Sequence, residues 1–213
     1  PKLKKIIKKK NILFVGKLNE AKGYNIFVNA AKKFNALYKG WNFIAVGNEP
    51  RKEIFPAKDI VNEIGYKSNK YVLNLYKNSE ISVGNSVWNE PLGRIAIESS
   101  SRKCLPIISN IAGLKESKSI AYVLKNNNAT ELFKVLKKLT QKTSLRKQLQ
   151  NKFYNNNNFS IQRTSKKLDT IRHNLLYGSS YNKYQSNNFK ILHVANFNEL
   201  SEGRLYYSFA NKL

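Results

Sequence analysis

Short apolar runs alternate along the chain with longer segments of helical period. The runs NILFVG (11–16), WNFIAVG (41–47) and ISVG (81–84) are almost entirely apolar and end in Gly, which is typical of buried parallel strands. Between the first two runs, residues 24–40 place apolar side chains at the spacing of an amphipathic helix. The order of strand, helix and strand predicts a βαβ unit.

The same alternation continues to residue 176. It predicts two more strands, LPIISN (105–110) and SIAYVLK (119–125). It also predicts helices near 57–64, 69–78, 93–103, 129–157 with a break near Lys142, and 160–176. Short apolar strands separated by helices indicate an α/β fold with a doubly wound parallel sheet.

The composition of the chain changes after residue 176. Residues 177–188 have no apolar periodicity, as expected for a linker, and 189–198 begin a new apolar strand that a helical segment follows. A strand and half a helix cannot form a core alone. We therefore predict a domain at 1–176, a linker at 177–188 and, at 189–213, the truncated start of a second α/β domain. The chain begins with Pro1 and contains no Met, which indicates a piece of a longer polypeptide.

The composition fits a folded protein with a strong positive charge. Hydrophobic residues make up 41% of the chain, and the single cysteine, Cys104, excludes an intramolecular disulfide and favours the cytoplasm. The net charge of +25 is compatible with nucleic acid, anionic lipid or phosphorylated ligands. The lysines accompany many Asn, Ile, Tyr and Phe residues, a bias typical of AT-rich genes. A basic module that binds nucleic acid or an anionic membrane stays the alternative function, although no basic, aromatic-interleaved motif is present.

Three segments that follow predicted strands carry candidate chemistry. In GKLNEAKG, Gly16 permits a tight turn, and Lys17 and Lys22 can reach a phosphate, although the glycine spacing is neither a dinucleotide fingerprint nor a P-loop. In NEPLG, a helix that begins near Gly93 presents free N–H groups to an anion. In NIAGLKES, Gly113 allows a close approach of the backbone to a ligand. Because ligands bind at the carboxyl ends of parallel strands, these segments predict a pyrophosphate-binding cleft.

Other polar side chains complete this hypothesis. Glu90 lies beside the predicted helix start and Glu98 at least one turn inside the helix, and carboxylates of this kind accept hydrogen bonds from sugar hydroxyls. No His, Cys and Asp cluster has the spacing of metal ligands. We interpret Cys104 as a core thiol and His173 as a surface or packing residue. The two tryptophans, Trp41 and Trp88, are expected to pack in the core or at its rim, with stacking on a base as the alternative.

The segments NILFVGKLNEAKG, FIAVG and NEPLGRIAIESSSRKCLPIISNIAGLKES resemble the C-terminal, donor-binding half of the family-4 retaining glycosyltransferases of GT-B architecture. The resemblance covers roughly residues 9–176. It implies that Lys17 and Lys22 contact the nucleotide diphosphate, that Glu98 holds the ribose, and that Glu90 is the catalytic residue facing the donor sugar. The segment of Pro91, Leu92 and Gly93 would present its backbone to the ligand, with Leu92 and Gly93 as the N–H donors because proline has none. Arg94 would either bind phosphate or only flank the helix start.

The chain departs from the pattern of this family at four positions. The family usually has Arg at Lys17, Phe at Leu92, and Gly at Lys103 and Ala112. The tail at 189–213 resembles the start of a GT-B acceptor-side domain, which suggests two glycosyltransferase units in tandem.

The resemblance also implies a reaction and its partners. The expected donor is a UDP-, GDP- or ADP-linked sugar, and the acceptor is a hydroxyl group. No metal or other cofactor is expected, and nucleic acid is not an expected specific partner. The acceptor-binding N-terminal domain is missing, so the fragment is not expected to be active alone. The expected context is cell-envelope polysaccharide synthesis in the cytoplasm, either free or in peripheral contact with the inner face of the membrane.

Overall fold

A computed structural model describes residues 8–49, 59–157 and 161–177 of the 213-residue chain. The chain divides into two units, one from Pro1 to Ile161 and one from Gln162 to Leu213. The first unit contains the sheet and every predicted site residue. In the second unit, the described residues belong to a single helix.

The sheet of the first unit has six parallel strands in the order β3-β2-β1-β4-β5-β6. This order, with the two halves of the sheet built outward from β1 and β4, confirms the predicted doubly wound α/β fold. The strands are β1 (Lys9–Val15), β2 (Asn42–Val46), β3 (Asn62–Glu63), β4 (Ser79–Gly84), β5 (Leu105–Ile108) and β6 (Tyr122–Val123).

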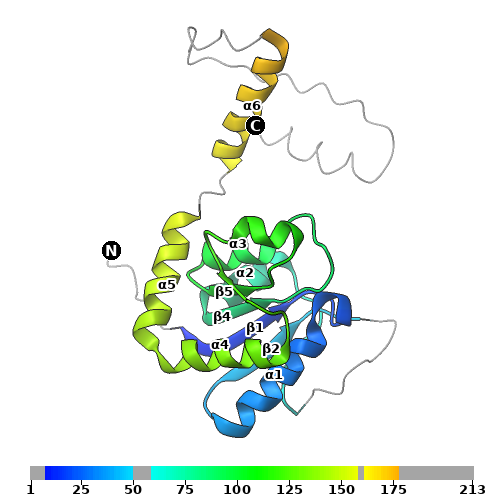
Figure 1. The fold of residues 1–213 in the computed structure, drawn as a ribbon, viewed down its shortest axis with the longest axis vertical. Helices are drawn as coiled ribbons and strands as arrows, with labels where there is room; N and C mark the ends of the chain where they lie inside the picture. Colours follow the sequence, from blue (N-terminus) through cyan, green and yellow to red (C-terminus); the bar gives the residue numbers. More distant parts are fainter. Residues whose placement is uncertain (1–7, 50–58, 158–160, 178–213) are drawn as a thin grey trace. The chain divides into compact units, whose positions relative to one another are not determined.

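Helices cover both faces of this sheet (Figure 1). They are α1 (Tyr24–Leu37), α2 (Asn69–Lys77), α3 (Arg94–Ser100), α4 (Ala129–Gln141) and α5 (Thr143–Asn156). The helix α6 (Ile161–Tyr177) begins at the unit boundary and belongs to the second unit from Gln162 onward. Two short 3-10 helices, η1 (Glu20–Lys22) and η2 (Ala112–Ser117), follow β1 and β5. The predicted helix break near Lys142 is confirmed, because α4 ends at Gln141 and α5 begins at Thr143.

Two of the predicted elements are wrong in type or extent. In place of the helix near 57–64, the described part contains β3, and the Ile64 N–H donates to the Ala45 carbonyl at 3.0 Å. The apolar spacing there resembles a helix, but pairing with β2 determines the conformation. The strand predicted at 119–125 is reduced to β6. The predicted linker beyond Tyr177 and the strand and helix at 189–213 lie outside the described residues.

The apolar core follows the alternation of side chains along the strands. Ile12 and Phe14 of β1 belong to the larger core cluster, which includes the buried faces of α1 and α4. Leu13 points to the opposite face, where it packs with Val72 and Tyr76 of α2. Figure 1 shows α1 and α4 on one side of the strands and α2 and α3 on the other. Helices thus lie against the two faces of the sheet, and ligand chemistry is expected at one end of the strands.

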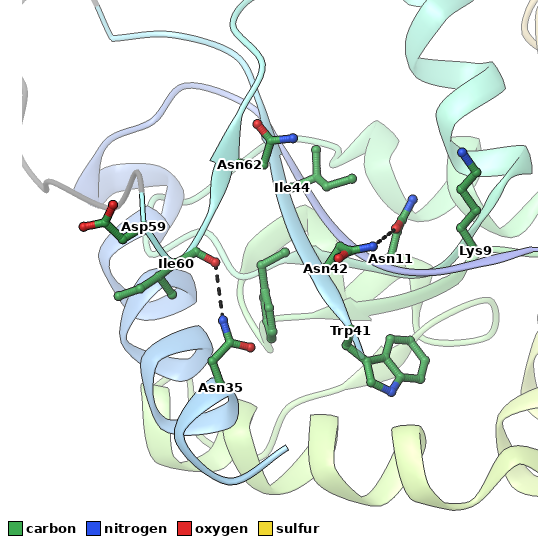
Figure 2. A pocket seen from close by; sticks show the side chains of 10 residues that line it. Lys9, Asn11, Asn35, Trp41, Asn42, Ile44, Asp59, Ile60 and Asn62 are labelled. Carbon is green, nitrogen blue, oxygen red and sulfur yellow. Dashed lines mark hydrogen bonds between the residues drawn. The ribbon is translucent and has the colours of Figure 1, made fainter. Parts of the chain in front are cut away.

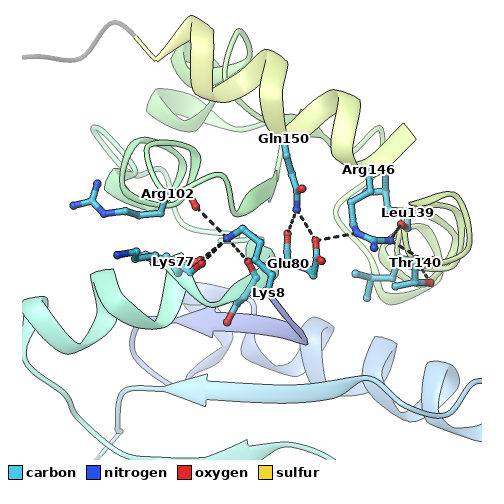
Figure 3. A network of polar contacts seen from close by, with 11 residues as sticks. Lys8, Lys77, Glu80, Arg102, Leu139, Thr140, Arg146 and Gln150 are labelled. Carbon is cyan, nitrogen blue, oxygen red and sulfur yellow. Dashed lines mark hydrogen bonds and ion pairs between the residues drawn. The ribbon is translucent and has the colours of Figure 1, made fainter. Parts of the chain in front are cut away.

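A buried ionic cluster lies at the amino end of β4 (Figure 3). The Arg146 Nε atom lies 3.1 Å from the Glu80 Oε2 atom, and Gln150 Nε2 donates to the same oxygen at 2.8 Å. Arg146 also donates to the Leu139 carbonyl at 2.7 Å, which caps the end of α4. Glu80, Arg146 and Gln150 are 9%, 4% and 6% exposed, so this cluster joins α4, α5 and β4 away from solvent.

Lys8 closes the same end of the sheet. Its ammonium donates to the backbone carbonyls of Lys77 at 2.8 Å, Ser79 at 2.9 Å and Arg102 at 3.1 Å. Burial lowers the pKa of the Lys8 ammonium. The lysine thus satisfies carbonyl groups at the ends of α2 and α3, which have no partners within their helices.

The turn that leads from α3 into β5 shows how one family departure is accommodated. Lys103 occupies the expected Gly position and adopts a left-handed conformation with φ of 55°. This conformation is costly for a residue with a Cβ atom.

The next residue, Cys104, is fully buried, and burial raises the pKa of its thiol to about 12. The prediction of a core thiol is confirmed.

Candidate functional site

The loops that follow β1 and β4 meet at the carboxyl end of the sheet. These two strands are neighbours, but the chain leaves β1 toward β2 and leaves β4 toward β5, on the other side. The strand order therefore reverses between them, which is where open α/β sheets bind ligands. The backbone N–H groups of Val87 and Trp88 both donate to the Ala21 carbonyl, at 2.9 and 3.0 Å. Direct hydrogen bonds thus join the two loops that carry most of the predicted site residues.

Asn and Ser side chains reinforce this junction. Asn85 Nδ2 donates to the Gly23 carbonyl at 2.8 Å, and the Ser86 hydroxyl donates to the Ala21 carbonyl at 2.9 Å. Ser109, after β5, and Asn127, after β6, both donate to the Ser86 carbonyl. These four residues were not predicted from the sequence. The available signal was a short polar side chain directly after an apolar strand, a position that faces the ligand-binding end of the sheet.

Lys22 and Glu90 form an ion pair between these loops. The Lys22 Nζ atom lies 2.8 Å from the Glu90 Oε1 atom, and the two side chains are 33% and 20% exposed. Asn19 accepts a hydrogen bond from the Lys22 backbone N–H at 3.1 Å, which holds the short helix η1 in place. The pair is accessible from solvent but anchored through the backbone. The structure therefore brings together two predicted site residues that are far apart in sequence.

A third loop, which follows β5 and carries Gly113, is hydrogen-bonded to the backbone of Glu90. The Gly113 N–H donates to the Glu90 carbonyl at 2.9 Å. A Cβ atom at this position would lie 1.8 Å from the Pro91 carbonyl oxygen, so only glycine fits. The close backbone approach predicted at Gly113 is thus made to the Glu90–Pro91 segment. A contact between Gly113 and a ligand stays a prediction.

The helix α3 begins at Arg94, with Gly93 as its N-terminal cap, as predicted. The Arg94 side chain is 79% exposed, and its Nε atom lies 3.9 Å from the Glu98 Oε1 atom one turn further on. Glu98 itself is 21% exposed. Burial, and then the nearby Glu98 carboxylate, raise the pKa of Tyr76. Glu98 therefore stands at the junction of α3 and α2, with part of its carboxylate open to solvent.

The remaining predicted residues lie on the same loops. Lys17 is exposed directly after β1, and the preceding Gly16 donates its N–H to the Val46 carbonyl at 3.0 Å. Pro91 and Leu92 are exposed between Glu90 and α3. Because α3 has only seven residues, its dipole is small. Charged side chains are therefore the stronger anion-binding groups at this end of the sheet.

A hollow of about 460 Å³ lies at the opposite, amino end of the strands (Figure 2). Its lining includes Asn11, Asn35, Asn42 and Trp41. Asn42 Nδ2 donates to the Asn11 Oδ1 atom at 3.2 Å, so two of these amides already pair with each other. No predicted site residue lines this hollow. We do not place the ligand here, because parallel sheets bind ligands at their carboxyl ends.

The other residues singled out in the sequence take structural positions. Trp41 packs against the core, and the Arg146 guanidinium lies 5.1 Å from its ring centroid, as predicted for a packing residue. The packing expected for Trp88 is wrong, because this side chain is 63% exposed on the β4–α3 loop. His173 is half-buried on α6, which agrees with a surface or packing position.

Two further features are absent from the described residues. No group of three or more His, Cys, Asp or Glu side chains in this part of the chain is placed to hold a metal ion. In the same ranges, no helix combines the length and the apolar character that crossing a membrane requires.

A doubly wound parallel sheet with ionic side chains at its switch point is the architecture of nucleotide-binding α/β domains. Residues 1–156 match the family model described as glycosyl transferases group 1. The chain therefore belongs to this family of glycosyltransferases. A search of curated proteins finds no match to the sequence.

Solved structures of GT-B glycosyltransferases share the fold. A glycosyltransferase from Rickettsia africae is 25% identical, with a TM-score of 0.68 over 81% of this chain and 49% of that one. The Anabaena protein Alr3699/HepE, solved in complex with UDP-glucose, is 14% identical, with a TM-score of 0.61 over 76% of this chain and 49% of that one. This chain thus spans about half the length of these structures.

A shorter structure matches over most of its length. The C-terminal domain of the group 1 glycosyltransferase LpcC from Francisella tularensis is 20% identical, with a TM-score of 0.61 over 70% of this chain and 85% of that one. The shared fold is therefore that of one GT-B domain.

Proposed function

We propose that this chain is the donor-binding half of a retaining glycosyltransferase and holds a nucleoside-diphosphate sugar at the carboxyl end of its sheet. The observation that carries the proposal is the Lys22–Glu90 ion pair, which joins the loops after β1 and β4 at the switch point. A cation and a carboxylate side by side match a ligand that has a phosphate next to sugar hydroxyls. Neither group is buried, so both are accessible to such a ligand.

Each predicted residue has a role in this proposal. Lys17 and Lys22 bind the diphosphate as point charges, with Arg94 as a further cation beside the start of α3. Glu98 accepts hydrogen bonds from the ribose hydroxyls, and Glu90 does so from the donor sugar. The backbone N–H groups of Leu92 and Gly93 donate to sugar and phosphate, whereas Pro91, which has no backbone N–H, shapes the loop before them. Gly16 and Gly113 shape the loops around them.

The proposed chemistry depends on stabilising the leaving group. When sugar passes to an acceptor hydroxyl, negative charge develops on the departing diphosphate. Fixed cations such as Lys17 and Lys22 stabilise that charge in the transition state. We therefore expect transfer without a metal ion or another cofactor. The sugar that we propose is a hexose.

The proposed partners extend beyond this chain. We expect an acceptor-binding domain to complete the active site, because the solved structures are about twice as long as the matched region. UDP is the first nucleotide to test, since a protein of the same fold was solved in complex with UDP-glucose. A cytoplasmic enzyme of cell-envelope polysaccharide synthesis, in peripheral contact with the membrane, is the context that we propose.

The test is a thermal-shift panel of UDP, GDP, ADP and their glucose conjugates, followed by calorimetry with the best ligand. We expect the nucleotides of one base to raise the melting temperature of the protein. Glu98→Ala should lower the affinity for the selected ligand about tenfold, which corresponds to the loss of one or two hydrogen bonds to a charged group. The matched control is Glu20→Ala, since Glu20 is an exposed glutamate on η1 at the same end of the sheet.

Two results would contradict the proposal. One is an absence of any nucleotide binding by the unaltered chain. The other is equal affinity of the Glu98→Ala and unaltered chains. Strongly salt-dependent binding to RNA, with no response to nucleotides, would support the basic module in its place.

A further inference from the structure

The Glu90 carboxylate occupies a position where it would meet any phosphate bound by Lys22. The Lys22 ammonium donates to Glu90 Oε1 at 2.8 Å. A phosphate oxygen on the same ammonium would form a second bond of similar length. The two negatively charged oxygens would then lie within about 5.6 Å of each other, since two charge-assisted hydrogen bonds of about 2.8 Å share one nitrogen. The Glu90 carboxylate is therefore close enough to interact with the charge of that phosphate and with a sugar attached to it.

The position of this carboxylate is held from two sides. The Glu90 carbonyl accepts the Gly113 N–H at 2.9 Å, and the Lys22 backbone is held by Asn19. The Glu90 side chain is 20% exposed, so solvent screens its charge only in part. Its repulsion of a neighbouring anion is therefore stronger than that of a fully solvated carboxylate.

The donor and the product of transfer differ at the phosphate that Lys22 would bind. Transfer breaks the bond between the sugar anomeric carbon and the terminal phosphate oxygen, and the electron pair stays on the diphosphate. The acceptor hydroxyl oxygen forms the new bond to the anomeric carbon, and its proton passes to water. The free terminal phosphate then carries about −1.5 to −2 charge near neutral pH, compared with about −1 for the sugar ester. The donor also brings sugar hydroxyls, which donate to a carboxylate. Glu90 should therefore attract the donor and repel the product.

We propose that Glu90 makes this site prefer the nucleoside-diphosphate sugar over the free nucleoside diphosphate that remains after transfer. This inference rests on the proposed function, because it requires the diphosphate at Lys22. It adds a role in product release to the proposed contact with the sugar. The Lys22–Glu90 pair thus binds the donor and weakens retention of its product.

The test compares the unaltered chain with Glu90→Gln, which keeps the shape of the side chain and removes its charge. Calorimetry measures UDP and UDP-glucose, or the GDP or ADP counterparts if the panel selects them. We expect Glu90→Gln to bind UDP about fivefold more tightly, the effect of removing one partly screened like charge. The affinity for UDP-glucose should stay the same or fall, so the preference for the donor drops at least fivefold.

The control is Glu20→Gln, which removes one negative charge from the same end of the sheet and leaves the Lys22–Glu90 pair intact. An unchanged preference in Glu90→Gln, with both ligands still bound, would overturn this inference and leave the proposed function standing. An equal shift in Glu20→Gln would also overturn it, because the effect would then be one of net charge. If the unaltered chain binds neither ligand, the proposed function falls and this inference with it.

Discussion

The two ends of the parallel sheet use the same types of charged side chain in opposite ways. At the amino end, Arg146 and Glu80 pair at 3.1 Å, and their side chains are only 5% and 12% exposed. At the carboxyl end, Lys22 and Glu90 pair at 2.8 Å but are 33% and 20% exposed. Burial rather than distance distinguishes the two pairs.

This difference separates a structural role from a binding role. The Glu80 carboxylate also accepts from Gln150, and Arg146 also caps α4, so the hydrogen-bonding groups of the amino-end cluster are largely occupied within the protein. The pair at the carboxyl end has fewer internal bonds and more solvent contact. Breaking the first should therefore cost stability, whereas changing the second should alter affinity.

The largest expected effect is that of Arg146→Met at the amino end. The substitution leaves Glu80 buried without its cation, which costs roughly 3 kcal/mol in the free energy of unfolding. Urea denaturation measures this loss. Nucleotide affinity of the folded protein should stay unchanged, because the cluster lies at the opposite end of the strands.

The matched control for that prediction is Arg94→Met. The Arg94 side chain is 79% exposed and lies 3.9 Å from its partner Glu98, so we expect a loss of less than about 0.5 kcal/mol. Equal losses for the two variants would show that burial does not separate the two ends of the sheet. Adding Glu80→Gln to Arg146→Met should restore part of the stability, since the unpaired charge is then gone.

A smaller effect is expected from Gly113→Ala at the carboxyl end. The new Cβ atom would overlap the Pro91 carbonyl oxygen and push the Glu90 segment away from η2. We expect a loss of about 2 kcal/mol in stability, as for other overpacked sites, together with weaker nucleotide binding. Denaturation and calorimetry measure the two quantities.

Gly40→Ala separates these two consequences. A Cβ atom at Gly40 would meet no atom within 4 Å, but its φ of 83° makes the substitution costly. Here stability should fall by about 1 kcal/mol with no change in affinity. If Gly113→Ala binds nucleotide as well as the unaltered chain does, then Gly113 does not position the site.

The smallest effect on stability is expected for Lys17→Ala. This exposed side chain should contribute less than about 0.5 kcal/mol to folding, whereas nucleotide affinity should fall about fivefold as one phosphate contact is lost. Lys10→Ala is the control, because Lys10 is an exposed lysine near the amino end of β1, the strand that precedes Lys17. Equal losses of affinity would indicate a general effect of positive charge.

Much of the fold was predictable because the local sequence patterns and the tertiary contacts favour the same strands and helices. The apolar run that ends at Gly16 becomes β1, and the helical spacing after Gly23 becomes α1. The disagreement comes at residues 57–64, where apolar spacing favours a helix but the free edge of β2 pairs with Asn62–Glu63. An edge pairing depends on a strand elsewhere in the chain, so no local pattern reveals it.

The candidate site was predictable in its parts but not in its contacts. Glycine turns and charged residues after apolar runs located Lys22 and Glu90 separately. The hydrogen bonds that Asn85, Ser86 and Asn127 form between the loops were not predicted, because single polar residues after strands are common in loops. The amino-end cluster of Glu80 and Arg146 was also missed, since charged residues in a basic chain read as solvent-exposed.

The sequence by itself determined the alternation of strands and helices, and with it a doubly wound sheet whose carboxyl ends carry lysines and glutamates. Those features are local, because periodicity and turn chemistry act over a few residues. Only the tertiary structure decided that Lys22 contacts Glu90 across 68 positions, while Arg146 is buried with Glu80 at the other end. Burial and partner choice depend on which strands become neighbours, and the strand order β3-β2-β1-β4-β5-β6 sets both.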